Sequence, residues 1–267
     1  MILLIDVGNT RTKWALAGDA DAVRDIQSGA LSHFGVCMNA ELSLSSLQIT
    51  AQKASKVVVA NVAGEQMAQQ LQQLLLPLSI HFIKPTFKAC GITNAYFKPE
   101  KLGVDRWAAL IAAWHLTQQS CLVVNAGTAI TIDALNRQGV FLGGTIMPGL
   151  HLMRAALDNN TANLGLNVGE YVSFPNNTKD AIDTGCINAA IGAIMLMLNK
   201  MQMQQSEKLQ VILTGGDASK LLAAINQLEN KVIIAPYFET PLLPNLEPHL
   251  APNLVLQGLF LLERERA

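Results

Sequence analysis

Two stretches of the sequence, 119 residues apart, repeat one another and decide the expected fold. Residues 5–16 are IDVGNTRTKWAL, and residues 124–135 are VNAGTAITIDAL. In each copy a strand-like run ends in a polar turn containing glycine and continues as a second strand-like run, which is typical of a β-hairpin. The repeat predicts a duplicated α/β unit whose two polar hairpins face each other across a cleft; chance similarity is the alternative. The matched positions are Gly8 with Gly127, Thr12 with Thr131, Ala15–Leu16 with Ala134–Leu135, and Asp6 with its isostere Asn125.

Strand-like and helix-like segments alternate along the rest of the chain, which predicts an α/β fold. Residues 142–145 and 147–149 are expected to form turns before a helix, and the five prolines of 236–252 predict a loop. The expected strands are 2–5, 57–62, 122–125, 129–134, 211–214 and, more weakly, 232–235; the expected helices are 65–76, 104–116, 150–157, 180–201, 218–228 and 254–265.

The composition argues against several classes of protein. The 267 residues include 19 Lys and Arg against 20 Asp and Glu, so no basic excess favours nucleic-acid binding. The four cysteines form no CxxC pair and the five histidines lack metal-ligand spacing. The apolar start is interrupted by Asp6, and the uncharged stretch 184–199 is shorter than the ~20 residues of a membrane span. We therefore expect a soluble, cytoplasmic protein without a nucleic-acid or membrane partner.

The two polar turns predict an anion site. Glycine-containing turns rich in Thr and Asn present backbone N–H groups to anions, and two of them suit a triphosphate. Asp6, at the end of the first strand, can hold a divalent cation through water, and Arg11 and Lys13 add cationic donors. An ordinary hairpin turn is the alternative for each stretch alone. The chain has no GxxxxGK[ST] sequence and no GxGxxG sequence after a strand, so any ATP site is of another kind.

A second group of candidate residues opens the helix expected at 104–116. In the sequence LGVDRW (102–107), Asp105 would accept a proton from a substrate hydroxyl while Arg106 holds a carboxylate of the same substrate. Tyr96 could add a phenolic hydroxyl to that pocket. The alternatives are helix capping for Asp105 and a core position for Tyr96. Residues 214–217 (TGGD) lie where a nucleoside often binds, or form a tight turn.

Taken together, D-V-G-N-T at 6–10, G-V-D-R at 103–106 and G-T-A at 127–129 resemble the motifs of the type III pantothenate kinases, a family that includes the Bvg accessory factors. The resemblance covers nearly the whole chain and keeps the motifs in family order. It implies the duplicated actin/sugar-kinase/Hsp70-like (ribonuclease H-like) α/β fold with a cleft between two halves. The half at 1–118 would carry the first phosphate loop and the substrate segment, and the half at 119–267 the second phosphate loop.

The same resemblance implies ligands and site residues. It implies ATP with Mg²⁺ or another divalent cation near Asp6, pantothenate as the acceptor, and a homodimer. Family members bind a monovalent cation, K⁺ or NH₄⁺, with an Asp where this chain has Asn125, so potassium dependence is expected to be weakened or lost. Asp105 matches the proton acceptor. The matches to ATP-binding positions are Asp6, Val7, Gly8, Asn9, Thr10, Arg11, Thr12, Lys13 and Thr128; those to pantothenate-binding positions are Tyr96, Gly103, Val104, Asp105, Arg106 and Thr178.

The leading hypothesis is ATP-dependent phosphorylation of the 4′-hydroxyl of pantothenate, the first step of coenzyme A biosynthesis. A non-catalytic accessory or regulatory homologue is the main alternative, favoured by Asn125 and opposed by the intact Asp6, Asp105 and Arg106. A kinase or phosphatase of the same fold acting on a sugar or a polyphosphate is a third reading, because a fold does not determine a substrate.

Overall fold

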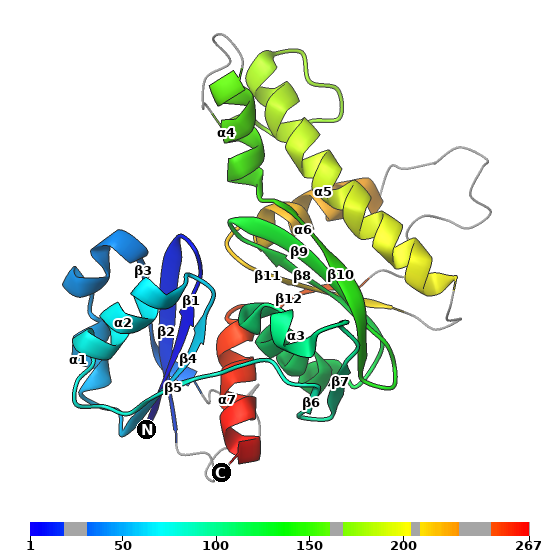
Figure 1. Cartoon of the computed structure of the whole chain (residues 1–267). Helices are drawn as coiled ribbons and strands as arrows, with labels where there is room; N and C mark the ends of the chain where they lie inside the picture. Colours follow the sequence, from blue (N-terminus) through cyan, green and yellow to red (C-terminus); the bar gives the residue numbers. More distant parts are fainter. Residues whose placement is uncertain (19–30, 161–167, 204–208, 230–246, 267) are drawn as a thin grey trace. The chain divides into compact units, whose positions relative to one another are not determined.

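The computed structural model describes five stretches of the chain, which form two compact units (Figure 1). The described residues are 1–18, 31–160, 168–203, 209–229 and 247–266. The first unit comprises Met1–Gln118, Gly139–Phe141 and Asn253–Ala267, and the second comprises Gln119–Gln138 and Leu142–Pro252.

The first unit is built on a five-stranded sheet of order β3-β2-β1-β4-β5. β1 and β2 form the predicted antiparallel hairpin, and β1 pairs in parallel with β4. Both β1 and β4 are short apolar runs covered on both faces, as central strands of a mixed sheet usually are. The strands are β1 (Ile2–Val7), β2 (Arg11–Ala17), β3 (Leu31–Met38), β4 (Lys56–Asn61) and β5 (Ile80–Phe82).

Helices cover both faces of this sheet. On one face, Leu3, Ile5 and Val7 of β1 pack with side chains of α1 and α2, while α3 and α7 contact the strands from the other face. The alternation of side chains along β1 therefore turns Asp6 away from the α1–α2 core. The helices are η2 (Asn39–Leu44), α1 (Leu47–Ala51), α2 (Glu65–Leu74), η3 (Pro99–Lys101), α3 (Val104–Thr117) and α7 (Leu254–Arg266).

The C-terminal helix α7 belongs to the first unit, although we expected the halves to be 1–118 and 119–267. The boundary after Gln118 is common to both divisions, but α7 packs along α3. Gly258 makes this close packing possible, because a Cβ at that position would lie 1.9 Å from the carbonyl oxygen of Ala108. The chain therefore returns to its first unit at its end.

The second unit contains the sheet order β12-β11-β8-β9-β10. β8 and β9 form the second predicted hairpin, and β8 pairs in parallel with β11. β10 begins in the first unit, where Val140 and Phe141 pair with β7 (Ile92–Asn94), which in turn pairs with β6 (Lys88–Ala89). The strands are β8 (Cys121–Ala126), β9 (Ala129–Leu135), β10 (Val140–Pro148), β11 (Gln210–Thr214) and β12 (Glu247–Leu250).

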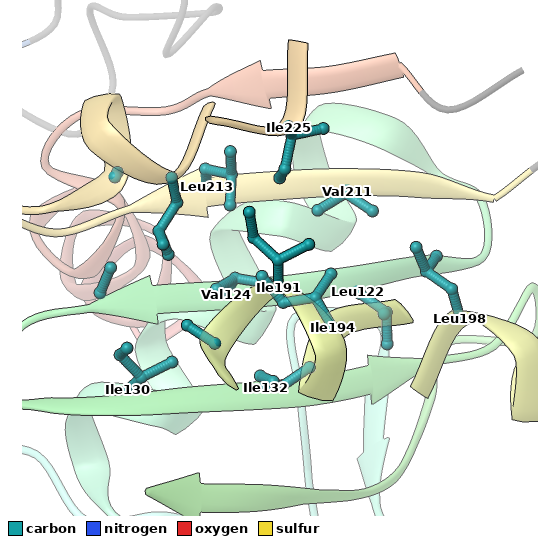
Figure 2. Close-up of a cluster of buried hydrophobic side chains, with 14 of the residues drawn as sticks. Leu122, Val124, Ile130, Ile132, Ile191, Ile194, Leu198, Val211, Leu213 and Ile225 are labelled. Carbon is teal, nitrogen blue, oxygen red and sulfur yellow. The ribbon is translucent and has the colours of Figure 1, made fainter. Parts of the chain in front are cut away.

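Helices α4 (Leu150–Asn160), α5 (Thr178–Gln202) and α6 (Ala218–Glu229) complete the second unit. Figure 2 shows that apolar side chains of α5 lie against the face of β8, β9 and β11, with Ile225 of α6 beside them. By length and composition alone, α5 could cross a bilayer, but half of its most apolar window is buried in the unit. In this structure α5 serves as a core helix.

The structure confirms the main predicted strands and helices and corrects two of the predicted irregular segments. Residues 142–145 and 147–148, expected as turns, are part of strand β10. Within this strand Val140, Phe141 and Ile146 favour extended backbone. Residues 247–250, expected in a loop, form β12, because an edge strand tolerates Pro248. The strand expected at 232–235 lies outside the described residues.

Candidate functional site

The site in the first unit starts at the loop between β1 and β2. The Gly8 N–H donates a hydrogen bond of 3.0 Å to the Arg11 carbonyl oxygen, which closes the turn. Asn9 and Arg11 are exposed at its tip, whereas Thr12 is fully buried. The Thr12 hydroxyl donates a hydrogen bond of 2.8 Å to Oδ1 of Asn39. This buried side chain therefore supports the loop and is not exposed to bind an anion.

Asp6 and Lys13 stand opposite each other on the hairpin, on the face that points away from the α1–α2 core. Burial raises the pKa of Asp6 to about 7, an effect that Lys13 opposes and that Asp105 reinforces. Asp105 therefore lies near enough for the two carboxylates to interact. A buried carboxylate with a raised pKa beside a second carboxylate is a place where a bound cation stabilises the ionised forms.

Asp105 occupies the first turn of α3, two residues after Gly103. The Arg106 backbone N–H donates a hydrogen bond of 2.8 Å to Oδ1 of Asp105. A Cβ at position 103 would lie 2.6 Å from that same oxygen, so glycine is what leaves room for the carboxylate. Burial raises the pKa of Asp105, more than the backbone N–H and the charge of Arg106 lower it. A raised pKa makes this carboxylate a better proton acceptor than an exposed Asp.

Arg106 is buried among aromatic rings. Its guanidinium carbon lies 5.9 Å from the centre of the Tyr96 ring and 5.8 Å from that of Phe141, and the two rings stack at 5.9 Å. The buried Asn94 orders the segment that carries Tyr96, since its Oδ1 accepts the Tyr96 N–H at 3.0 Å. The sequence indicated Tyr96 and Arg106, but it did not indicate Phe141, which reaches them from β10.

A cavity of about 540 Å³ in the first unit is bounded by Gly103 and Val104. Its other walls come from the ends of β4 and β5, from α2 and from η3, so three separate stretches of chain build it. The sequence carried no signal for this assembly. The remaining lining residues are Asn61, Val62, Glu65, Ala68, Gln72, Phe82, Ile83, Lys84, Pro85, Glu100 and Leu102.

The second unit presents the other predicted loop, between β8 and β9. The Gly127 N–H donates to the Ala129 carbonyl oxygen at 3.0 Å, and Thr128 is exposed at the tip. Backbone from the start of α4 supports this loop, because the Gly149 N–H donates to the Thr128 oxygen at 2.9 Å and a Cβ at Gly149 would lie 2.1 Å from the Gly127 oxygen. Gly215, in the TGGD turn, also packs against β8, because a Cβ at Gly215 would lie 2.3 Å from the Ala126 carbonyl oxygen.

The second loop is one residue shorter than the first, which changes the match between the two repeats. Asp6 pairs with Lys13, whereas Asn125 pairs with Thr131. Thr131 is therefore the structural counterpart of Lys13 and not of Thr12. It is 8% exposed, and its hydroxyl has no hydrogen-bond partner among the described residues. Such a hydroxyl beside the amide of Asn125 fits an oxygen-ligated monovalent cation.

Thr178 begins α5 in the second unit, where it is exposed. Asn177 caps this helix by accepting the Asp180 N–H at 3.1 Å. The segment before α5 also contacts this helix, because the Asp183 carboxylate accepts a hydrogen bond from the Gly169 N–H. Asp183 is ion-paired with Arg154 as well. These contacts tie the start of α5 to the segment before it, and the sequence indicated none of them.

The described residues contain no group of three His, Cys, Asp or Glu side chains that could hold a metal ion by themselves. A divalent cation at Asp6 would therefore take most of its ligands from water and from substrate phosphates, as Mg²⁺ commonly does. The raised pKa of Asp6 fits such a site, because the ionised carboxylate lacks sufficient compensating charge in the protein alone.

Comparison with known proteins agrees with this geometry. Residues 2–200 match the family model described as type III pantothenate kinase. The type III pantothenate kinase of Methylobacillus flagellatus is 41% identical, with 98% of each chain covered. Two solved structures resemble the fold: a Campylobacter jejuni protein described as a Baf family transcriptional activator (TM-score 0.57, 19% identity, 99% and 98% covered) and glucokinase from Balamuthia mandrillaris (TM-score 0.50, 12% identity, 100% and 93% covered). The actin-like, sugar-kinase-like α/β fold is thereby confirmed.

Proposed function

The chain belongs to the type III pantothenate kinase family, and from that premise we propose that it transfers the γ-phosphoryl group of ATP to the 4′-hydroxyl of pantothenate with the residues described above. The observation that carries the proposal is the placement of two carboxylates, Asp6 at the end of β1 opposite Lys13 and Asp105 in the first turn of α3. Asn125 was the feature that favoured a non-catalytic homologue, whereas the intact Asp6, Asp105 and Arg106 and the kinase relatives support a catalytic one.

Each glycine loop offers donors for the phosphates of ATP. Backbone N–H groups at the tip of the first loop, the Lys13 ammonium and the exposed Thr128 of the second loop are the donors available. A divalent cation near Asp6 would offset the negative charge of the phosphates when bound. Positioning and electrostatic stabilisation supply most of the rate in phosphoryl transfer, so these groups need little covalent chemistry.

Asp105 would accept the proton of the pantothenate hydroxyl and orient its oxygen toward the phosphorus. Its raised pKa suits this task. Arg106 would bind the substrate carboxylate, with its guanidinium oriented by the rings of Tyr96 and Phe141. The adjoining cavity, bounded by Gly103 and Val104, offers space for the body of the acceptor. Thr178 is assigned to pantothenate on the family resemblance alone.

Three finer assignments complete the proposal. A monovalent cation would be held by the amide oxygen of Asn125 and the hydroxyl of Thr131, more weakly than by the Asp of the family, and a small rate difference between potassium and sodium buffers checks it. A homodimer is proposed on the family resemblance alone, and light scattering measures it. A cytoplasmic location follows from coenzyme A synthesis, and cell fractionation tests it.

The decisive experiment measures ADP release with ATP and Mg²⁺, with and without pantothenate, for the native chain and for Asp105→Asn. We expect pantothenate-dependent ADP release that falls at least ~100-fold in the variant, because the amide cannot accept the proton. The KM for ATP should change little, since Asp105 does not contact the phosphates in this scheme.

Asp158→Asn, on α4, is the matched control and should retain full activity. Turnover of Asp105→Asn near the native rate would remove Asp105 from the role of proton acceptor. ADP release that responds to a sugar and not to pantothenate would move the substrate assignment to another acceptor.

A further inference from the structure

Asn39, the first residue of η2, makes three hydrogen bonds to the first phosphate loop. Its Nδ2 donates to the Gly8 carbonyl oxygen at 2.8 Å, and its Oδ1 accepts the Thr12 hydroxyl at 2.8 Å. Its backbone N–H donates to the Thr10 carbonyl oxygen at 3.0 Å. One residue, 31 positions away from Gly8 in the sequence, thus contacts the loop at its start, its tip and its end.

These bonds determine which way the loop peptides face. In a planar trans peptide the C=O and the following N–H point in opposite directions. Because Asn39 donates hydrogen bonds to the carbonyl oxygens of Gly8 and Thr10, these oxygens face Asn39. The N–H groups of Asn9 and Arg11 therefore point away from Asn39. Those N–H groups belong to the exposed residues of the loop. Asn39 therefore orients the donors that an anion would meet.

The two loops differ in how they are supported. The second loop is supported by backbone atoms. Gly149 and Gly215 pack so closely in this region that a Cβ at either position would collide with neighbouring backbone. The first loop has a side-chain amide in the corresponding role, and the only glycine within it is Gly8. A side chain can be replaced without altering the backbone, so its contribution can be measured directly.

We propose that Asn39 is a positioning residue for nucleotide binding, which holds the first loop in its phosphate-binding conformation without contacting the nucleotide. This inference rests on the proposed function in that the loop is taken to bind ATP. Asn39 is half-buried beneath the loop, and the hydroxyl that it accepts is fully buried. A residue so placed affects nucleotide affinity through the loop and leaves the acceptor site unaffected.

The test replaces Asn39 with Ala and measures three quantities: the KM for ATP, the KM for pantothenate, and the affinity for ADP by calorimetry. We expect the KM for ATP and the Kd for ADP to rise about tenfold, the loss of one to two net hydrogen bonds, while the KM for pantothenate stays within about twofold. The ADP measurement needs no turnover, so it tests Asn39 even if pantothenate proves not to be the acceptor.

Gln48→Ala is the matched control, because Gln48 also donates from an amide to a backbone oxygen, that of Leu74, in the same unit. Its nucleotide affinity should equal that of the native chain. Thr12→Val and Thr12→Ser provide a second route if Asn39→Ala does not fold. Val removes only the hydroxyl bound to Asn39 and should weaken ADP binding, whereas Ser keeps the hydroxyl and should restore it.

Unchanged ADP affinity in Asn39→Ala, or equal ADP affinity in Thr12→Val and Thr12→Ser, would overturn the proposal. An equal rise of both KM values with a lowered melting temperature would also overturn it, since that pattern describes a general loss of structure. A selective rise in the KM for ATP supports it.

Discussion

Asp6 lowers stability at the position where we propose that it serves function. Its pKa of about 7 in the folded chain lies far above the value of 3.8 for an ordinary Asp. The folded state therefore binds the Asp6 proton more tightly than the unfolded state does. Between about pH 4 and pH 7 this group makes the free energy of unfolding fall as pH rises. Such a carboxylate is expected where a cation or a phosphate-bound metal is to be held.

Asp6→Asn should therefore stabilise the chain at pH 8 in the absence of metal and nucleotide, while activity is lost. The gain in free energy of unfolding is at most about 4 kcal/mol, which is the equivalent of a shift of three pKa units. It is smaller than this limit to the extent that the amide, like the carboxylate, loses hydration on burial. The difference from the native chain should shrink toward zero as pH falls to 4, where Asp6 is mostly protonated. Urea unfolding in EDTA at a series of pH values measures it.

Asp158→Asn, on α4 in the second unit, serves as the control and should show no such gain at pH 8. A variant Asp6→Asn that is less stable than the native chain at pH 8 would contradict the assignment of burial as the dominant effect on Asp6.

Among the elements, α3 and α7 form a closely packed pair of helices. α3 carries Asp105 and Arg106 in its first turn, and α7 packs along it at the distance that Gly258 allows. Apolar side chains of both helices are almost fully buried, which leaves no space for adjustment. The placement of the proposed proton acceptor thus depends on a helix at the other end of the sequence.

Gly258→Ala should destabilise the first unit by about 1–3 kcal/mol, although Ala is the better helix former, because its Cβ would collide with the backbone of Ala108. The displacement of α3 should also lower kcat. Thermal unfolding followed by tryptophan fluorescence, together with the kinase assay, measures both effects.

Gly192→Ala on α5 is the matched helical control, because a Cβ there meets no atom within 4 Å. That variant should gain up to about 1 kcal/mol. If Gly258→Ala gained stability as well, the close approach of α3 and α7 would not limit the packing.

At the scale of the whole molecule, the first unit is assembled from three separate parts of the chain. All three tryptophans, Trp14, Trp107 and Trp114, lie in it, so tryptophan emission reports on this unit alone. Leu259 and Phe260 of α7 are fully buried, so the first unit is not complete until α7 has been made.

A chain that ends at Pro252 should therefore lose the native emission of the first unit, with its maximum shifted to the red as Trp14 and Trp107 become hydrated. The helical circular dichroism of the second unit should persist in part. Fluorescence and circular dichroism of the truncated chain measure this. A chain that lacks only Arg266 and Ala267 is the control, and native emission from the chain ending at Pro252 would show that the first unit is complete without α7.

Local patterns predicted much of the fold and of the candidate site. The hairpins at Gly8 and Gly127, the helix beginning at Val104 and the long α5 were predicted because turn residues and apolar periodicity act over a few positions. The identity of Asp6, Asp105 and Arg106 as candidates came from the same short motifs. Confirmation of the family strengthens the roles assigned to these residues, which remain proposals.

Only the tertiary structure decided how these pieces are combined. The amide of Asn39 beneath the first loop, the ring of Phe141 beside Arg106 and the return of α7 to α3 join residues that are distant in sequence. The pairing of Asn125 with Thr131 was also invisible, because a loop one residue shorter changes which side chain faces the site. Sequence by itself determines the short-range elements and the chemistry of single residues. Burial, register and long-range contact determine how that chemistry is tuned, because they arise only when the whole chain packs.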